Sequence, residues 1–185
     1  MLWTRLKSRL RAFADDARGS ITVEVVVLLP MLYWAYCAMF VYFDAYRQVS
    51  VNQKAAYTIS DMLSRETDPI DRDYMNASHA MLEFLSRSRN PVRLRVSVVR
   101  YVENQDQFRR DWSKVVGGGG LRELSNRDVR NWHDKLPALL NNERIIVVET
   151  FTDYTPPFNI GMDDQEIGTF VFTKPRFAPQ LLWQN

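Results

Sequence analysis

Cysteine and histidine are scarce in this chain, which holds one of the former and two of the latter. With Cys37 alone, neither an intramolecular disulfide nor a cysteine-based metal cluster can form. His79 and His133 lie far apart in the sequence, and no Cys–His or Ser–His–Asp order typical of nucleophilic catalysis can be argued from them. We therefore expect a protein that is not an enzyme, with no catalytic residues, no cofactor and no histidine or cysteine metal ligands.

Loop motifs that bind phosphate or calcium are also incomplete. The run Gly117–Gly120 is followed by no Gly-Lys-Ser/Thr, so it predicts a flexible loop and not a phosphate-binding loop. Acidic residues cluster twice, at Asp68, Asp71 and Asp73 and at Asp163, Asp164 and Glu166. Neither cluster has the twelve-residue loop with a closing glutamate that holds calcium in helix–loop–helix sites. Calcium binding at either cluster stays open on the sequence alone.

Charge is nearly absent from one long apolar stretch. Between Ile21 and Phe43 there are 23 residues, and Glu24 is the only formally charged one. As a helix this stretch would rise roughly 35 Å, slightly more than the ~30 Å hydrocarbon core of a bilayer. Residues 1–19 carry five basic and two acidic side chains, and the charges after the stretch are mixed. The positive-inside tendency then predicts a cytoplasmic N-terminus and a C-terminal part outside the membrane.

Two simpler interpretations of this stretch compete with a specialised one. A secretory signal peptide has an apolar region of about 7–15 residues that ends in small residues at a cleavage site. The apolar run here is longer, and no such site stands out before Phe43. A plain, uncleaved signal anchor is the second possibility, and the sequence leaves it open.

Glu24 and Pro30 are the unusual residues of the stretch. A carboxylate at the mouth of a membrane helix is costly and calls for a reason. If the chain is cut after Gly19, Ser20 becomes the amino terminus and Glu24 the fifth residue, roughly 6 Å along the helix. An ion pair between that amine and Glu24 of another subunit would fix the stagger more than it adds stability. Alternatively, Glu24 is an incidental anchor residue. Pro30 is either an ordinary kink or a built-in weak point of the helix.

The stretch 18–30 resembles the start of the TadE/TadF-like pseudopilins of the tight-adherence (Flp, type IVc) pilus system. In that family a glycine precedes the cut, glutamate is at mature position five, and an apolar run reaches a proline, which matches Gly19, Glu24 and Pro30. Val25 stands where the family's major pilin usually has tyrosine, which speaks against the major pilin. Residues 145–157 and 174–177 resemble the family's late strand and its closing Pro-Arg segment.

The resemblance implies processing between Gly19 and Ser20 by a dedicated prepilin peptidase. It also implies a minor-pilin role in starting or capping a pilus that supports surface adherence. The implied partners are other minor pilins, the major Flp pilin, the peptidase and the inner-membrane assembly platform. The implied location is the bacterial inner membrane, in a single pass with a periplasmic C-terminal domain, or the extracellular pilus. The alternative is a signal-anchored periplasmic binding domain or enzyme that belongs to no pilus.

The predicted organisation has three parts. Residues 1–19 form a cytoplasmic leader, 20–43 a transmembrane helix, and 44–185 a pilin-like domain, made of a helical stalk over 44–65 and an α+β globular part over 66–185. The stalk is predicted from a stripe at helical spacing, which comprises Ala45, Val49, Asn52, Ala56, Ile59 and Leu63. This stripe fits packing against the sheet of the domain, or a partner helix.

The remaining segments predict a small, mostly antiparallel sheet. Thr67-Asp68-Pro69 ends the long helix, because the residue before a proline resists the helical conformation. A second helix is expected over 73–88, and a short helix capped by Ser125 over 126–141. Strands are expected over 92–102, with a bulge at Val98-Val99, and over 144–154 and 167–173. The predicted fold class is α+β, with the N-terminal helix packed on the sheet in a pilin-like arrangement.

One basic concentration lies in the predicted domain, and it comprises Arg87, Arg89, Arg93, Arg95 and Arg100. It fits the solvated side of a strand and loop, or a contact for acidic partners, DNA or an anionic surface. No aromatic residues interleave it in the manner of nucleic-acid-binding segments. The basic pI largely reflects residues 1–19, so nucleic acid is not an expected partner.

Overall fold

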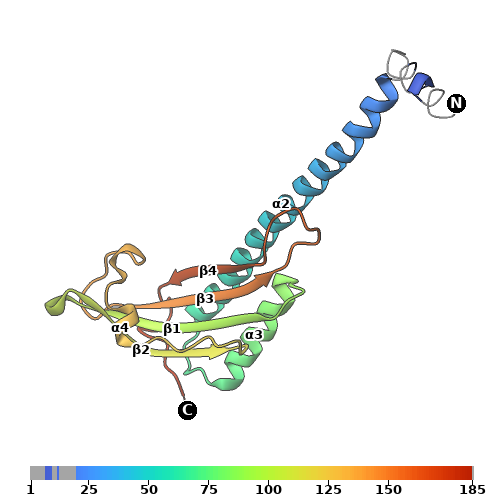
Figure 1. The fold of residues 1–185 in the computed structure, drawn as a ribbon. Helices are drawn as coiled ribbons and strands as arrows, with labels where there is room; N and C mark the ends of the chain where they lie inside the picture. The colour runs from blue at the N-terminus through green and yellow to red at the C-terminus, as the bar shows by residue number, and fades with distance from the viewer. Residues whose placement is uncertain (1–6, 10–11, 13–19, 185) are drawn as a thin grey trace. The chain divides into compact units, whose positions relative to one another are not determined.

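The structure is a computed structural model that describes residues 7–9, 12 and 20–184. Two compact units share the chain, Met1–Asp44 with Pro157–Met162 and Ala45–Pro156 with Asp163–Asn185. Helix α2, Ser20–Arg65, begins in the first unit and contributes its residues from Ala45 onward to the second (Figure 1). The helix contains no glycine and a single proline, and it ends directly before the Thr67-Asp68-Pro69 sequence predicted to stop it.

The second unit is built on a four-stranded antiparallel sheet with the strand order β2-β1-β3-β4. Strands β1, Val92–Val102, and β3, Arg144–Tyr154, have the predicted bounds, and β4, Gln165–Thr173, starts two residues before the predicted strand. Strand β2, Gln107–Val116, was not predicted. The predicted fold class, a long N-terminal helix on a small antiparallel sheet, is confirmed.

One face of the sheet packs against α2 and against α3, Arg72–Ser86. The stripe predicted on α2 is buried from Asn52 onward, and Ile59 and Leu63 are fully enclosed in this core. They meet Leu94 and Val96 of β1, so the stripe packs against the sheet of its own domain. Burial of side chains of this size contributes about 1.5–3 kcal/mol each.

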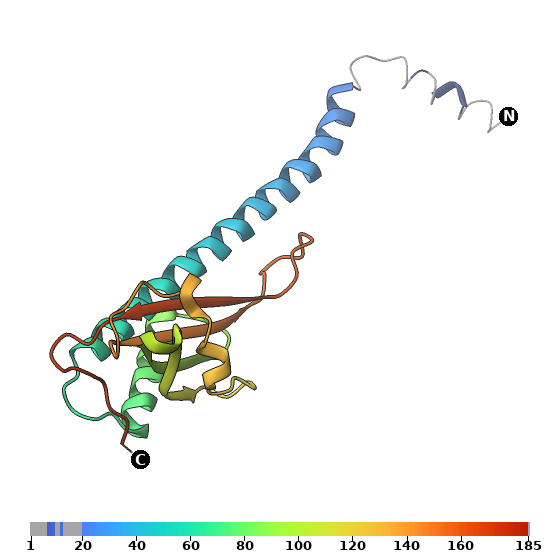
Figure 2. The ribbon, with the colours of Figure 1, turned by 90° about the vertical axis from the view of Figure 1, so that its left-hand side faces the viewer.

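The opposite face is covered by α4, Asn126–Val129, by the 3-10 helix η3, Trp132–Asp134, and by the chain that follows (Figure 2). Val129 and Trp132 pack there on Ile145 and Val147 of β3. Both faces of the central strands are covered, and the first half of β3 is accordingly a continuous apolar run from Ile145 to Val148. Strand β1 alternates instead over 92–98, with Arg93, Arg95 and Ser97 between apolar residues.

The bulge predicted at Val98-Val99 is present, but the extra residue lies on the neighbouring strand. Val98 pairs with Trp112 and Val99 pairs with Arg110, which leaves Asp111 of β2 without a partner residue in β1. Pairing between β1 and β3 continues through the same position without a shift. The bulge therefore reverses which face of the sheet the following side chains point to. As a result Trp112 packs against the core on one face and Phe108 against the core on the other.

The prediction of a helix over 126–141 is correct for the first turn and wrong beyond it. Ser125 caps α4 through a reciprocal capping box with Asp128, as the sequence predicts, but α4 stops at Val129. Pro137 has no amide hydrogen, and its ring would collide with the preceding turn of a continuing helix. Beyond α4 the chain forms a short 3-10 helix and then an irregular segment, and the side chains of Trp132, Leu136 and Leu139 are buried on the sheet.

The two edge strands of the sheet, β2 and β4, differ in the hydrogen bonds made by their outer backbone groups. On β2, the Phe108 amide donates to the Arg130 carbonyl at 3.2 Å and the Arg110 amide donates to Asn126 Oδ1 at 2.9 Å. On β4, no hydrogen bond joins the backbone to any segment beyond β3 among the residues described. The outer edge of β4 is therefore open along its length, whereas that of β2 is closed in part by the α4 segment.

Gly117 begins the tight turn after β2, and we expect its replacement by alanine to be strongly destabilising. Gly117 and Gly118 both have positive φ, 103° and 69°. A Cβ at Gly117 would lie 2.4 Å from the Val92 carbonyl oxygen and 2.7 Å from His79 Nε2, whereas one at Gly118 meets nothing within 4 Å. Gly118→Ala should cost about 1 kcal/mol and Gly117→Ala about 3 kcal/mol in urea unfolding. Equal losses would contradict the close approach.

Candidate functional site

The N-terminal half of α2 carries the residues predicted for processing and assembly. Gly19 lies outside the residues that the structure describes, and Ser20 is the first residue of α2. Glu24 is exposed on the second turn of this helix. The cut predicted between Gly19 and Ser20 stays a prediction, as does the pairing predicted for Glu24. In the structure, Glu24 lies within the regular α-helix α2.

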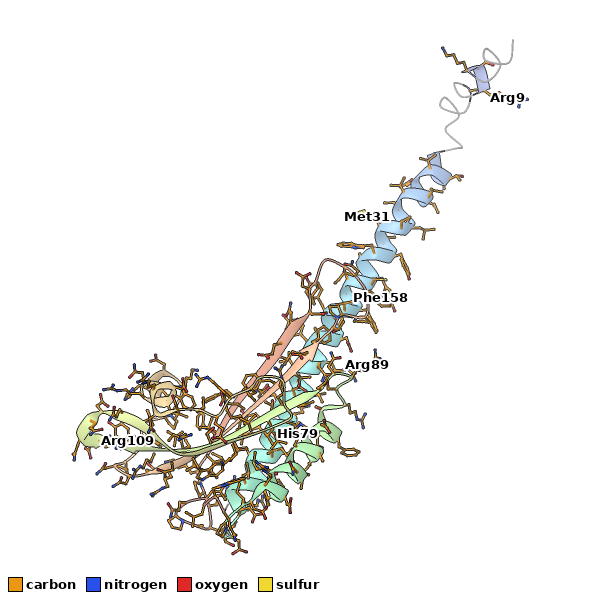
Figure 3. All side chains as sticks on the ribbon, turned by 60° about the horizontal axis from the view of Figure 1, so that its bottom comes forward. Arg9, Met31, His79, Arg89, Arg109 and Phe158 are labelled. Atoms are coloured by element: carbon orange, nitrogen blue, oxygen red, sulfur yellow. The ribbon has the colours of Figure 1, made fainter. Side chains whose placement is uncertain are left out.

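Apolar side chains around Glu24 are exposed on every side of the helix. Those that are more than half exposed include Ile21, Val23, Val26, Val27, Leu29, Met31, Leu32, Tyr33, Trp34, Tyr36 and Phe43. Figure 3 shows Met31 projecting from the helix among them. The helix is long and apolar enough to cross a membrane. So much exposed apolar surface fits a membrane anchor or a signal sequence.

Pro30 lies inside α2, which continues on both sides of it. A proline at this position leaves the carbonyl of Val26 without its helical donor. In the same unit, the connection between β3 and β4 contributes Phe158, whose ring meets that of Phe40 edge-on with centroids 5.9 Å apart. Sequence reasoning did not predict this contact, because nothing in residues 155–164 marks them as a partner of the helix.

The two acidic clusters considered for calcium do not converge. Asp71 caps α3 by accepting a hydrogen bond from the Tyr74 amide at 2.9 Å. Glu166 pairs with Arg93 at 2.7 Å. In the described part of the chain, no three His, Cys, Asp or Glu side chains come together in a way that could hold a metal ion. Asp71 and Glu166 thus have structural partners within the fold.

The basic stretch 87–100 is largely neutralised within the domain. Arg95 forms two hydrogen bonds with the carboxylate of Glu149, at 2.6 and 2.7 Å, and both side chains are about nine-tenths buried. Arg93 pairs with Asp153 as well as Glu166, and Arg100 pairs with Asp111 at 3.0 Å. This arrangement favours a structural role for the stretch over a contact with an anionic partner.

The two histidines make local contacts. The Nε2 atom of His79 lies 2.6 Å from the carbonyl oxygen of Val92, the first residue of β1, and both atoms lie close to Gly117. His133 of η3 lies 3.1 Å from a carboxylate oxygen of Asp106, which also accepts a hydrogen bond from the Tyr101 hydroxyl at 2.8 Å. The hydrogen bonds from Tyr101 and then His133 lower the pKa of Asp106, and the bond to Asp106 raises the pKa of Tyr101. These contacts tie the turn between β1 and β2 to η3.

Two cavities of the second unit are lined mostly by residues that the sequence analysis did not single out. One of about 820 Å³ lies between the start of α3, the end of β2 and Trp183. Lys114 lines this cavity, and its Nζ atom lies 3.3 Å from Glu123 and 5.1 Å from the centre of the Trp183 ring. The other, of about 380 Å³, is lined by Arg109, Arg127 and Arg130 among others. These arginines come from two segments, and only the unpredicted strand β2 brings them together.

Comparison of the chain with protein-family models, with curated proteins and with solved structures gave no match in any of the three. The described residues establish the architecture of the protein. A long N-terminal apolar helix of membrane-spanning length packs its C-terminal part on a four-stranded antiparallel sheet, and this layout is pilin-like.

Proposed function

We propose that this protein is a minor pilin, or pseudopilin, of a Tad/Flp type IVc pilus, which acts in the initiation or at the tip of the pilus. The observation that carries the proposal is the position of Glu24. It is the only formal charge between Ile21 and Phe43, and it would be the fifth residue after a cut at Gly19. The exposed apolar helix and the pilin-like layout of the domain support the same conclusion.

The proposed mechanism begins with removal of residues 1–19 by a prepilin peptidase. The Ser20 amine then becomes a cation at the end of an apolar helix, and it can pair with Glu24 of a neighbouring subunit. A charge pair in a low-dielectric bundle costs much to desolvate, so it selects the stagger at which both charges are matched. Pro30 gives the helix a point of weaker hydrogen bonding for its transfer from bilayer to bundle. The domain decides which minor and major pilins it meets.

The processing step is tested by the mass of the protein purified from cells with and without their prepilin peptidase. The expected result is a chain that starts at Ser20 in the first case and at Met1 in the second. A Gly19→Leu variant should stay uncut in both, because a bulky side chain replaces the smallest residue next to the scissile bond. An intact chain in both strains would overturn the proposal, and a cut near Phe43 would indicate a secreted protein.

A second candidate function is a binding domain held outside the membrane by a signal anchor. The cavity of about 820 Å³ favours it, because small-molecule sites are commonly of about 300–1,000 Å³. Mixed charges line that cavity, including Asp71, Asp73 and Glu123 against Arg72 and Lys114. The mass measurement separates the two functions, since a signal-anchored domain keeps residues 1–19.

A further inference from the structure

A basic cavity lies between the edge strand β2 and the short helix α4. Its volume is about 380 Å³, and its lining residues are Gln107, Phe108, Arg109, Asn126, Arg127 and Arg130. Figure 3 labels Arg109 at the end of the sheet where β2 starts, remote from His79. Half of the lining side chains are thus guanidinium groups, and the cavity has no acidic lining residue.

These three arginines differ from the arginines of the neighbouring strands. Arg93, Arg95, Arg100 and Arg144 of β1 and β3 each form an ion pair with a carboxylate at 3.0 Å or less. For Arg109 the only polar partner in the described part of the chain is the amide oxygen of Gln105, at 2.9 Å. Arg127 and Arg130 form no ion pair with any residue that the structure describes. The cavity therefore gathers three positive charges that lack an internal counterion.

The carboxylates of Glu123 and Asp128, which flank Asn126 and Arg127 in the sequence, are engaged with other residues. Asp128 of α4 accepts two hydrogen bonds from Arg122, at 2.7 and 2.9 Å, and further bonds from the amide and hydroxyl of Ser125. The bonds from Arg122, followed by those from Ser125, hold the pKa of Asp128 far below its usual range. Glu123 lies between Lys114, at 3.3 Å, and Arg110, at 3.9 Å. Neither carboxylate can turn to the cavity without losing these partners.

The walls of the cavity are fixed before any ligand arrives. The hydrogen bonds from the Phe108 and Arg110 amides to Arg130 and Asn126 tie α4 to the strand at both of its ends. Phe108 is buried, with its ring packed into the core on the α4 side of the sheet. The backbone on both sides of the cavity is therefore preorganised, and a ligand would order mainly the exposed side chains of Arg109, Arg127 and Arg130.

We propose that this cavity binds a phosphorylated sugar, either free or as a unit of a polymer. Guanidinium groups present paired donors that match the oxygens of a phosphate, and three of them meet here. The cavity has room for more than a phosphate alone, and small-molecule sites start at about this volume. Among the residues described, the Asn126 amide nitrogen and the Gln107 amide oxygen form no hydrogen bond, so they are available for sugar hydroxyls.

The test is calorimetric titration of the full chain in a non-ionic detergent with glucose 6-phosphate, inorganic phosphate and glucose. Glucose 6-phosphate should bind, inorganic phosphate should bind about tenfold more weakly, and glucose alone should give no heat. The double variant Arg127→Gln/Arg130→Gln should weaken glucose 6-phosphate by about tenfold or more, because it removes two charge-assisted contacts. Arg87→Gln/Arg89→Gln removes two exposed arginines elsewhere on the domain and should leave binding unchanged.

Absence of binding by both phosphate compounds would overturn the proposal. Equal weakening by the two double variants would also overturn it, because the effect would then reflect net charge and not the cavity. A phosphorylated polysaccharide that displaces glucose 6-phosphate at the same phosphate concentration would assign the ligand to a polymer, and failure to displace would assign it to a free sugar phosphate. The chain contains the same cavity whether or not residues 1–19 are removed, so the outcome is independent of the proposed pilin function.

Discussion

Replacing Glu24 with alanine should abolish incorporation of the protein into pili while leaving its processing and its domain unchanged. Glu24 is exposed, lies in the first unit and belongs to neither of the two cores formed around the sheet. A subunit without the carboxylate would leave the Ser20 amine of its neighbour unpaired in an apolar bundle, which costs several kcal/mol. The measurement is the amount of the protein in sheared pili relative to the amount in membranes.

Two further variants sharpen this experiment. Glu24→Gln keeps the size and polarity of the side chain and removes only its charge, so it should fail as the alanine variant does. Asp68→Ala removes one exposed negative charge from the chain just after α2, and it should assemble normally. Normal incorporation of the Glu24 variants would contradict the proposed ion pair, and loss of the folded domain in either of them would show that the assembly defect has another cause.

Replacing Glu149 with alanine should cost the domain about 3–5 kcal/mol of unfolding free energy. Glu149 is only 7% exposed, and its carboxylate accepts two hydrogen bonds from Arg95, at 2.6 and 2.7 Å. Arg95 also donates to the Arg122 carbonyl at 3.1 Å and lies 5.4 Å from the centre of the Phe151 ring. Truncation of Glu149 would leave this guanidinium buried without its counterion. Urea unfolding of the full chain in detergent measures the loss.

Glu166→Ala is the matched control for that substitution. Glu166 also pairs with an arginine of β1, at 2.7 Å, but its side chain is 51% exposed and Arg93 keeps Asp153 as a second partner. Its loss should therefore cost less than about 1 kcal/mol. The double variant Arg95→Met/Glu149→Leu should recover most of the stability lost in Glu149→Ala, because it removes both charges together. A Glu149→Ala cost as small as that of the control would contradict this account.

Strands with buried faces could be predicted from the sequence, and their pairing could not. The bounds of β1 follow from valine and leucine that alternate with polar residues, and those of β3 from a run of isoleucine and valine. The partner of Arg95 depends on the register between these strands, which joins residues 54 positions apart. Strand β2 escaped prediction because arginine, lysine and aspartate interrupt it and the bulge at Asp111 shifts its alternation.

The candidate sites divide in a similar way. Glu24 and Pro30 could be identified because they are exceptions within one continuous apolar run, and position along that run is all the hypothesis requires. The cavity of Arg109, Arg127 and Arg130 depends on contact between two segments, one of which was not predicted to be a strand. The basic stretch 87–100 was prominent in the sequence, yet the fold supplies carboxylates for three of its arginines.

The difference between the two edges of the sheet limits how copies of this domain can aggregate. Exposed strand edges are templates for pairing with other chains. The open edge at β4 permits two copies to pair edge to edge around a two-fold axis. In such a pair the β4 edge of each copy is hydrogen-bonded to that of the other. Growth beyond two copies would need a second open edge, and the bonds from Phe108 and Arg110 to the α4 segment close much of β2. Overexpressed domain should therefore accumulate as soluble pairs and resist the formation of amyloid-like fibres.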